Sequence, residues 1–187
     1  MSILIEQEEE KVANAFEVNR NVVLRSIRLA SATLTSTRLE EVDNVALQTQ
    51  VSFEPTNVSS EAETLVLSVS FVFRIIEGEN RAGAEIVRID CQLEADYGVR
   101  PDCVLTDQQI AAFHSGNAIF NCWPFFREYV QNSTVRMNYP APPIPLLRLI
   151  PKRKLVSKEM DKAEQGPTRK QRSKPKTKSR TSTHKID

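Results

Sequence analysis

The sequence has few of the residues that catalytic and metal-binding sites require. Its 187 residues include two histidines, three cysteines and five glycines. We find no Cys and His at metal-ligand spacing, no glycine-rich phosphate loop after a strand, and no nucleophile elbow. His184 lies in the basic C-terminal segment, and His114 next to Phe113 is better explained as a helix-surface or packing residue. We therefore expect a protein that is not an enzyme and that uses no metal or other cofactor.

The sequence also lacks the marks of secretion and of membrane insertion. Residues 1–11 are acidic with one short apolar patch, so they do not resemble a signal peptide. The most apolar stretch, residues 65–76, is interrupted by polar residues and is too short to span a bilayer. The odd number of cysteines and their spacing fit neither a disulfide framework nor a zinc motif. The three are Cys91, Cys103 and Cys122. We expect a cytoplasmic protein with reduced, packed cysteines and no membrane insertion.

The near-neutral net charge of +1 conceals two segments of opposite sign. Residues 151–187 carry 13 Lys and Arg against 4 Asp and Glu, whereas residues 1–150 carry 12 against 20. The basic segment contains no Phe, Trp or Tyr, so it cannot bury enough apolar surface to offset the entropy of ordering. We predict a basic disordered tail over residues 151–187, a flexible or helical segment over 1–19, and one domain over 20–150.

Alternating apolar and polar residues predict antiparallel strands before residue 100. Residues 45–53, 65–75 and 87–97 each have one apolar face and one more polar face. Residues 22–38 are rich in β-branched residues and complete a set of four strands, although their period is poor. Pro55 is expected to end the second strand, and residues 78–83 have the chemistry of a hairpin loop. A sheet of this kind covers a core with one face and leaves the other in water.

Helical signals follow the strands. Thr106 and Gln109 have the spacing of a capping box, and Gly116 is a candidate C-terminal stop for this first helix. Asn117 would then cap a second helix, in which Pro124 either kinks the chain or starts a new helix. The apolar stripe of that helix steps by four, three and four residues through Ile119, Trp123, Phe126 and Val130.

The order of these signals predicts the fold class. Four prolines between residues 140 and 145 favour an extended surface segment, and residues 144–151 are expected to form a short extended piece. Strands that precede helices favour segregated layers rather than alternating units. We therefore predict an α+β fold, in which a long, proline-interrupted helix packs on one face of a four-stranded antiparallel sheet.

Residues 117–143 carry a pattern that is more specific than their periodicity. An asparagine is followed by an aliphatic–aromatic pair, a proline, an Arg-Glu dipeptide, an aliphatic residue, and then a threonine, an arginine and a proline. The matching residues are Asn117, Ile119, Phe120, Pro124, Arg127, Glu128, Val130, Thr134, Arg136 and Pro143. This pattern resembles the long helix and the following loop of the SecB family of protein-export chaperones, and elsewhere only the order of elements is similar.

The resemblance implies a function and a set of partners. SecB-like proteins form a dimer of dimers, with their long helices sandwiched between sheets. They bind unfolded preproteins in long apolar grooves, without a cofactor, and deliver them to the secretion motor ATPase SecA. A second branch of the family instead serves as chaperone to the antitoxin of a toxin–antitoxin pair. We therefore expect a holding chaperone for unfolded polypeptides, or alternatively a chaperone dedicated to one partner such as an antitoxin.

The aromatic residues are candidates for the client groove and for the subunit interface. Apolar contact is non-directional and tolerates many client sequences, and an extended client can add hydrogen bonds at a sheet edge. The expected client-binding residues are Phe53, Tyr97, Phe113, Phe120 and Phe125. The expected oligomer-interface residues are Trp123, Phe126, Arg127 and Val130. The alternative for each aromatic is to fill the core, and the alternative for Arg127 with Glu128 is a solvated pair.

Two departures from the family pattern affect the choice of partner. Residues 144–151 replace the short hydrophobic helix of SecB, and the C-terminal tail is unusually basic. Delivery to SecA would be favoured by an acidic patch on the wet face of the sheet, for which the candidates are Glu54, Asp90, Glu94 and Asp96. A hypothesis of another class is a nucleic-acid-associated protein that binds through its tail with strong salt dependence. Its alternative is a tail that only aids solubility.

Overall fold

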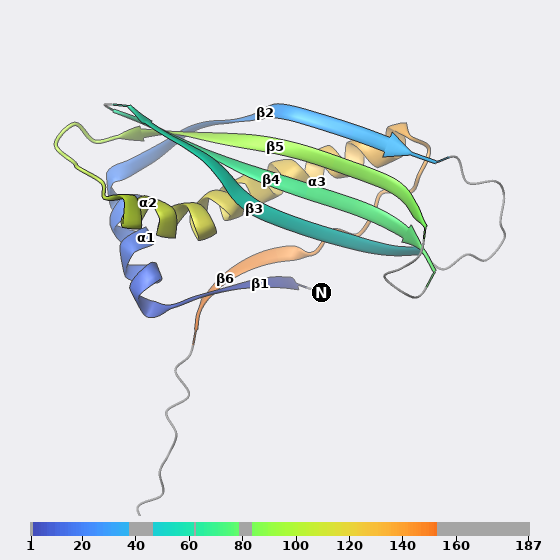
Figure 1. Cartoon of the computed structure of the whole chain (residues 1–187), viewed down its shortest axis with the longest axis horizontal. Coiled ribbons are helices and arrows are strands. Elements are labelled where there is room, and N and C mark those ends of the chain that lie inside the picture. Colours follow the sequence, from blue (N-terminus) through green and yellow to red (C-terminus); the bar gives the residue numbers. More distant parts are fainter. Residues whose placement is uncertain (1, 38–46, 62, 79–83, 153–187) are drawn as a thin grey trace, which may run out of the picture. The chain divides into compact units, whose positions relative to one another are not determined.

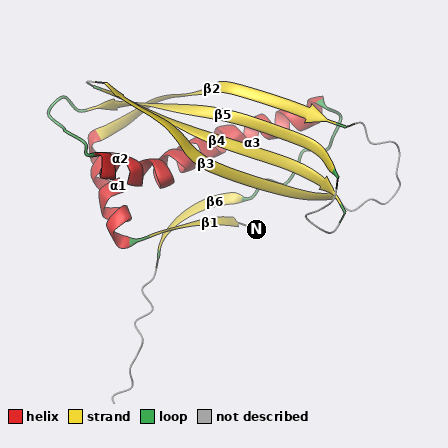
Figure 2. Ribbon diagram, in the orientation of Figure 1, coloured by secondary structure: helices red, strands yellow, loops and turns green. Residues whose placement is uncertain are grey.

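The computed structural model describes residues 2–37, 47–61, 63–78 and 84–152. Residues Met1–Arg153 form one compact unit. Figures 1 and 2 show its strands and helices. They are, in chain order, β1 (Ser2–Gln7), α1 (Glu9–Asn21), β2 (Val22–Ser36), β3 (Leu47–Glu61), β4 (Thr64–Glu77), β5 (Glu85–Val99), α2 (Asp107–Phe113), the π-helical turn η1 (His114–Ala118), α3 (Ile119–Arg136) and β6 (Leu146–Pro151).

The main layer is the predicted four-stranded antiparallel sheet. Its strand order is β2-β5-β4-β3, so β2 and β3 are the edge strands. The helix α3 packs against β3, β4 and β5 and lies on one face of this sheet (Figure 2). The predicted α+β class, with a long helix on one face of the sheet, is therefore confirmed.

The two central strands bury one face, as their alternation predicts. On β4 the inward residues Leu65, Leu67 and Val69 are fully buried, and on β5 Ile89 and Ala95 are buried in the same way. The residues between them are mostly half-buried on the opposite, polar face. Burial of such side chains is worth about 25 cal/mol per Å² of apolar surface removed from water. This shared inner face, covered by α3, is the hydrophobic core.

The prediction that Pro55 ends its strand is wrong. β3 continues through Pro55 to Glu61, and its pairing with β4 shifts register between Pro55 and Val58. Proline is tolerated on an edge strand or at a bulge, and β3 offers both at this position. The register shift then absorbs the local irregularity. Residues 45 and 46, where this strand was expected to begin, and residues 79–83 of the expected hairpin loop lie outside the described residues.

The first helical prediction is half correct. The Thr106 hydroxyl accepts from the Gln109 backbone N–H at 3.3 Å, and the Gln109 side chain accepts from the Thr106 backbone N–H at 2.9 Å. This confirms the capping box at the start of α2. Gly116 does not stop the helix, because α2 passes through the turn η1 directly into α3. Asn117 lies inside η1 and caps nothing.

The reason for Gly116 is a close approach to β1. A Cβ atom at position 116 would lie 2.0 Å from the Nε2 atom of Gln7. The Gln7 amide occupies the space where a side chain at position 116 would be, so a larger residue there would have to displace it. A glycine of this kind looks like a helix stop in sequence, yet here its role is contact between distant segments.

The long helix runs unbroken past its proline. Pro124 is inside α3, which extends from Ile119 to Arg136, so the expectation that it could begin a new helix is wrong. The missing N–H removes one hydrogen bond to the preceding turn. Trp123, Phe126 and Val130 flank or follow the proline and are buried against the sheet. This tertiary packing offsets the lost backbone bond.

The N-terminus contributes a strand that the sequence did not predict. β1 pairs in parallel with β6 in a separate two-stranded sheet, which we call the ribbon (Figure 1). The expected extended piece at residues 144–151 corresponds to β6. The helix α1 follows β1 and buries Ala15 and Val18 in the core. In the part of the chain that the structure describes, no helix has the length and hydropathy of a membrane-spanning segment.

Candidate functional site

The helix α3 joins its own sheet through an aromatic cluster. The rings of Phe71 and Phe126 are stacked, with centroids 4.6 Å apart, and Trp123 contacts both of them. The indole Nε1 donates to the Pro145 carbonyl at 3.1 Å. Trp123, Phe126 and Val130 are therefore packed inside this chain, as the core alternative for these predicted interface residues expects.

Two of the predicted client-binding residues are also in the core. Tyr97 and Phe113 are each 1% exposed, and their rings meet edge to face with centroids 5.3 Å apart. The Tyr97 hydroxyl accepts a hydrogen bond from Asn121, and burial raises the pKa of Tyr97 to about 12. Neither ring presents a surface to a client in this structure. We therefore leave both out of the groove proposed below.

The other three predicted aromatics lie at the surface but not together. Phe120 and Phe125 are each 46% exposed. Five residues apart on α3, they lie about 140° apart around the helix axis, on opposite flanks. Phe53 on β3 is half-buried, with its ring edge-on to Trp123 at 5.8 Å between centroids. Phe125 lines a groove beside β2.

This groove runs between β2 and α3, and we call it the β2–α3 groove. Its open volume is about 290 Å³. Apolar side chains come from the sheet and the near flank of the helix, whereas polar and charged groups come from α3. The lining residues are Ile27, Leu29, Leu93, Phe125, Glu128, Tyr129, Asn132, Ser133 and Arg136. An apolar floor with a polar rim is typical of a site for an amphipathic or extended peptide.

The groove exists because α3 does not cover β2. Ile27, Leu29 and Leu34 pair with Ala95, Leu93 and Ile89 of β5, so they point to the same side of the sheet as the core. Leu29 and Leu34 are nevertheless 44% and 40% exposed, whereas their partners on β5 are buried. The helix packs on β3, β4 and β5 and leaves this stripe bare. Contiguous exposed apolar surface of this kind marks interaction sites.

Sequence reasoning missed the β2 residues because two bulges interrupt their period. The pairing of β2 with β5 shifts between Leu24 and Ser26 and again between Leu29 and Ser31. Each extra residue moves the following side chains by one position, which restores the apolar residues to the inner face. The inward residues of β2 therefore follow one another at steps of three, two, three and two residues, and this spacing was the signal in the sequence that could have identified them. They are Leu24, Ile27, Leu29, Ala32 and Leu34.

β2 also presents an open hydrogen-bonding edge. Within the described residues it pairs only with β5, and Val23 on it is 67% exposed. An unpaired edge offers a row of N–H and C=O groups to any extended chain. The strand is 15 residues long, which is long for an edge strand. The β2–α3 groove therefore combines apolar side chains with a free backbone edge.

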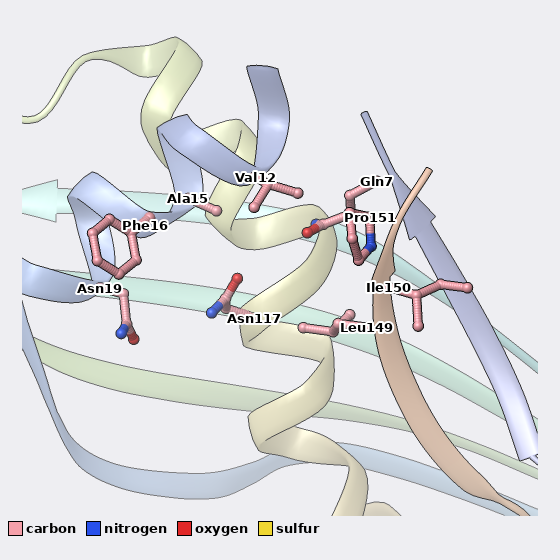
Figure 3. A pocket seen from close by; sticks show the side chains of 9 residues that line it. All are labelled: Gln7, Val12, Ala15, Phe16, Asn19, Asn117, Leu149, Ile150 and Pro151. Atoms are coloured by element: carbon pink, nitrogen blue, oxygen red, sulfur yellow. The ribbon is translucent and has the colours of Figure 1, made fainter. Parts of the chain in front are cut away.

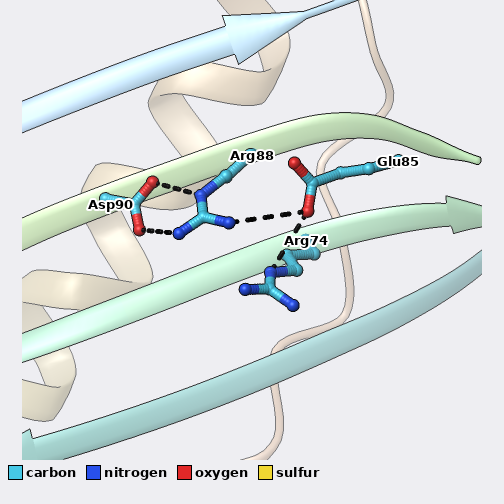
Figure 4. A network of polar contacts seen from close by, with 4 residues as sticks. All are labelled: Arg74, Glu85, Arg88 and Asp90. Carbon is cyan, nitrogen blue, oxygen red and sulfur yellow. Dashed lines mark hydrogen bonds and ion pairs between the residues drawn. The ribbon is translucent and has the colours of Figure 1, made fainter. Parts of the chain in front are cut away.

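The opposite, wet face of the sheet carries ion pairs rather than free acid (Figure 4). The Arg88 guanidinium donates two hydrogen bonds to the Asp90 carboxylate, at 2.6 and 2.8 Å. Glu85 lies 3.2 Å from Arg74 and 3.9 Å from Arg88. These side chains are about one third exposed and water screens their charges, so each pair contributes little to stability.

The candidate acidic patch is therefore partly neutralised. Besides Asp90, Glu94 is paired, in its case with Arg28 of β2. One oxygen of Asp96 is buried without a hydrogen-bond partner, and Glu54 lies exposed on the edge strand β3. Three of the four candidate residues lie on β5 and Glu54 lies on β3, and arginines pair with two of them. A strongly negative docking surface does not result from this arrangement.

The thiols of Cys91 and Cys122 and the imidazole of His114, which could take part in chemistry, are buried. Burial raises the pKa of the Cys91 and Cys122 thiols to about 12, so neither forms a thiolate near neutral pH. One ring nitrogen of His114 lies 2.7 Å from the Ser68 carbonyl, and burial lowers the pKa of this histidine below its ordinary value. Across the described ranges, no three His, Cys, Asp or Glu side chains are grouped to hold a metal ion.

Comparison with known proteins places this arrangement among solved folds. One similar structure is the SecB-like chaperone Rv1957 of Mycobacterium tuberculosis in complex with a ChAD peptide from the HigA1 antitoxin Rv1956. It aligns with a TM-score of 0.63 and 21% identity, over 73% of this chain and 97% of that chain. A protein of unknown function from Streptococcus agalactiae aligns with a TM-score of 0.32 and 11% identity, over 67% and 97%, and carries no argument.

Comparison of the sequence alone identifies no relative. No protein-family model matches the chain, and no curated protein matches its sequence. The evidence is therefore structural, and at 21% identity it concerns the fold. The predicted architecture and the alignment agree in the four-stranded antiparallel sheet and the long helix, and this chain has a SecB-like fold.

Proposed function

We propose that this protein is a chaperone that holds an extended, apolar segment of an unfolded polypeptide in the β2–α3 groove. The observation that supports this most is the bare apolar stripe of β2 beside Phe125, on the inner side of a sheet whose two central strands are covered. Apolar side chains of a client would be removed from water there without a requirement for one sequence. No covalent step is needed for such a function.

The number of clients separates two forms of this proposal. A general holdase binds many unfolded chains with modest affinity. A dedicated chaperone binds one partner tightly, and this second form is favoured by the similar structure, which holds a peptide of an antitoxin. We propose the dedicated form as the second candidate.

We also propose that the protein is a homo-oligomer of the dimer-of-dimers type. The open edge of β2 can pair with a second copy, since pairing uses the backbone edge and leaves the groove floor free. On α3, the half-buried Arg127 has a buried Nε atom without a hydrogen-bond partner in the single chain. An acceptor from a second copy would satisfy this donor, because buried charged groups are normally paired.

Two other partners receive less support. Delivery to the motor ATPase SecA would require a free acidic surface, and the pairing of Asp90 with Arg88 and of Glu94 with Arg28 reduces that surface. Binding of nucleic acid would depend on residues 153–187, which lie outside the described residues. If the full chain binds RNA or DNA through that segment, binding will weaken steeply as salt is added.

The test is client protection by groove variants of the full chain. In an aggregation assay with several unrelated unfolded proteins and the partner encoded beside its gene, native protein should keep clients soluble. Leu29→Glu and Phe125→Glu should each weaken client binding about tenfold or more, because a charge replaces an apolar contact. Val104→Glu is the matched control, since Val104 is 93% exposed away from the groove. Equal protection by all four proteins would exclude the β2–α3 groove.

A further inference from the structure

The ribbon is built differently from the rest of the fold. Among the described residues, β1 and β6 pair only with each other, in parallel, although residues 8–145 separate them in sequence. Two-stranded sheets have little stability of their own, so this one depends on the surface beneath it. Within the described residues, β1 is joined to the rest of the chain only through Glu8 and α1. It is therefore an extended N-terminal segment added as a strand to the edge of β6.

β1 has the side-chain pattern expected of a bound extended peptide. Ile3 and Ile5 pack against the core, and they pair with Leu147 and Leu149 of β6. Leu4, between them, is 52% exposed on the outer side. Apolar residues at alternate positions thus contact the protein while the backbone pairs with β6, as in strand addition to a sheet edge.

The fit of this segment is incomplete at its last residue. Gln7 is 6% exposed, yet its Nε2 atom has no hydrogen-bond partner and lies where a side chain of Gly116 would be. Figure 3 shows Gln7 at a pocket of about 200 Å³ that is also lined by Val12, Phe16 and Ile150. A buried amide donor without an acceptor is costly to retain. A segment with an apolar residue at this position would fit the site better.

We propose that the edge of β6 is a second binding site for an extended, apolar polypeptide segment, and that β1 occupies this site until such a segment displaces it. The preferred ligand has apolar residues at three alternate positions, which match Ile3, Ile5 and Gln7. This inference rests on the proposed function in one respect, namely that the ligand is an extended chain. Its site lies apart from the β2–α3 groove, so the two can be tested separately.

The test uses the full chain and a labelled synthetic peptide with the sequence of residues 2–8. Ile3→Ser with Ile5→Ser weakens the inward contacts of β1, whereas Leu4→Ser, the matched control, changes an exposed residue of the same strand. The double variant should bind the peptide on the order of tenfold more tightly than native protein, because its site is less often occupied. The control should bind like native protein. The fluorescence of Trp123, the only tryptophan, reports binding, because its indole donates a hydrogen bond to the Pro145 carbonyl next to β6.

A reversible lock provides the second measurement. Ile5→Cys with Leu149→Cys places two thiols at paired positions of the ribbon. The oxidised, cross-linked protein should lose peptide binding and the reduced protein should regain it.

Peptide binding that is equal in locked and unlocked protein would overturn the proposal. So would loss of the four-stranded sheet in the Ile3→Ser, Ile5→Ser variant, or its assembly into larger species without peptide binding. Leu29→Glu changes the β2–α3 groove and should leave peptide binding at the edge of β6 unchanged. A failure of the groove proposal is therefore distinguishable from a failure of the β6 proposal.

Discussion

The contact between Gln7 and Gly116 joins the ribbon to the helical layer at one point. The Gln7 amide fills the space in which a Cβ atom at position 116 would lie, at 2.0 Å. The neighbouring residues of η1 form a π-helical turn, which changes the path of the helix locally. A substitution at Gly116 in η1 should therefore alter the packing of Gln7 at the end of β1.

Gly116→Ala tests this contact. In the native background it should lower the free energy of unfolding by about 1–2 kcal/mol, because the methyl group displaces the buried Gln7 side chain. In a Gln7→Ala background the same change should be neutral or stabilising, because alanine favours helix over glycine by about 1 kcal/mol. Chemical denaturation of the four proteins measures this cycle. Equal effects of Gly116→Ala in both backgrounds would mean that the two residues do not interact.

His114 predicts a pH dependence of stability. Burial lowers its pKa in the folded protein below the ordinary value of 6.5. The unfolded chain therefore binds the proton more tightly, and the stabilising contribution is complete above pH 6.5 and is lost as the pH falls through the lower folded pKa. Denaturant unfolding at several pH values should show a shallower decline below pH 6.5 for His114→Gln than for native protein. Parallel pH profiles would contradict this assignment.

At the scale of elements, the strands that sequence reasoning predicts well are those whose environment repeats every two residues. β4 and β5 lie in the centre of the sheet with one covered face, so their alternation is regular. β2 is an edge strand with two register shifts, and its apolar residues lose that period. Pro55 is tolerated on the other edge strand, where the pairing with β4 shifts register directly after it.

The candidate site was harder to predict than the fold. Phe125 was identified from the sequence, but Leu29 and Ile27 were not, because nothing local indicates which edge strand the helix leaves bare. The alternation places Tyr97 on the apolar face of its strand, but for Tyr97 and Phe113 the sequence does not separate a groove from the core, and only the tertiary packing shows them buried. β1 is six residues long, and its pairing with β6 depends on segments at opposite ends of the described chain.

The helix α3 and the strand β2 together carry the proposed oligomer contacts. Native protein should have a solution mass above the 21.2 kDa of one chain, measured by sedimentation equilibrium. Arg127→Ala should shift this equilibrium toward smaller species, because it removes the donor whose partner we assign to a second copy. Arg20→Ala, which removes an exposed arginine of α1, should not. A native protein that sediments as a monomer at all concentrations would contradict the proposed assembly.

At the scale of the whole molecule, the described unit separates its surfaces by chemistry. One face of the sheet is polar and carries the pairs formed by Arg74, Glu85, Arg88 and Asp90. The other face is apolar, covered by α3 over the two central strands, whereas the edge strands β2 and β3 stay largely exposed. The account depends on this second face, because it assigns client binding to the bare strand.

Site-specific cross-linking tests that assignment most directly. A photoreactive amino acid at position 125 lies in the β2–α3 groove, and the same amino acid at position 72 lies on the polar face of β4. With a labelled unfolded polypeptide bound to the full chain, the account predicts efficient cross-linking from position 125 and little from position 72. Cross-linking mainly from position 72, or none from position 125 while the polypeptide is bound, would contradict it.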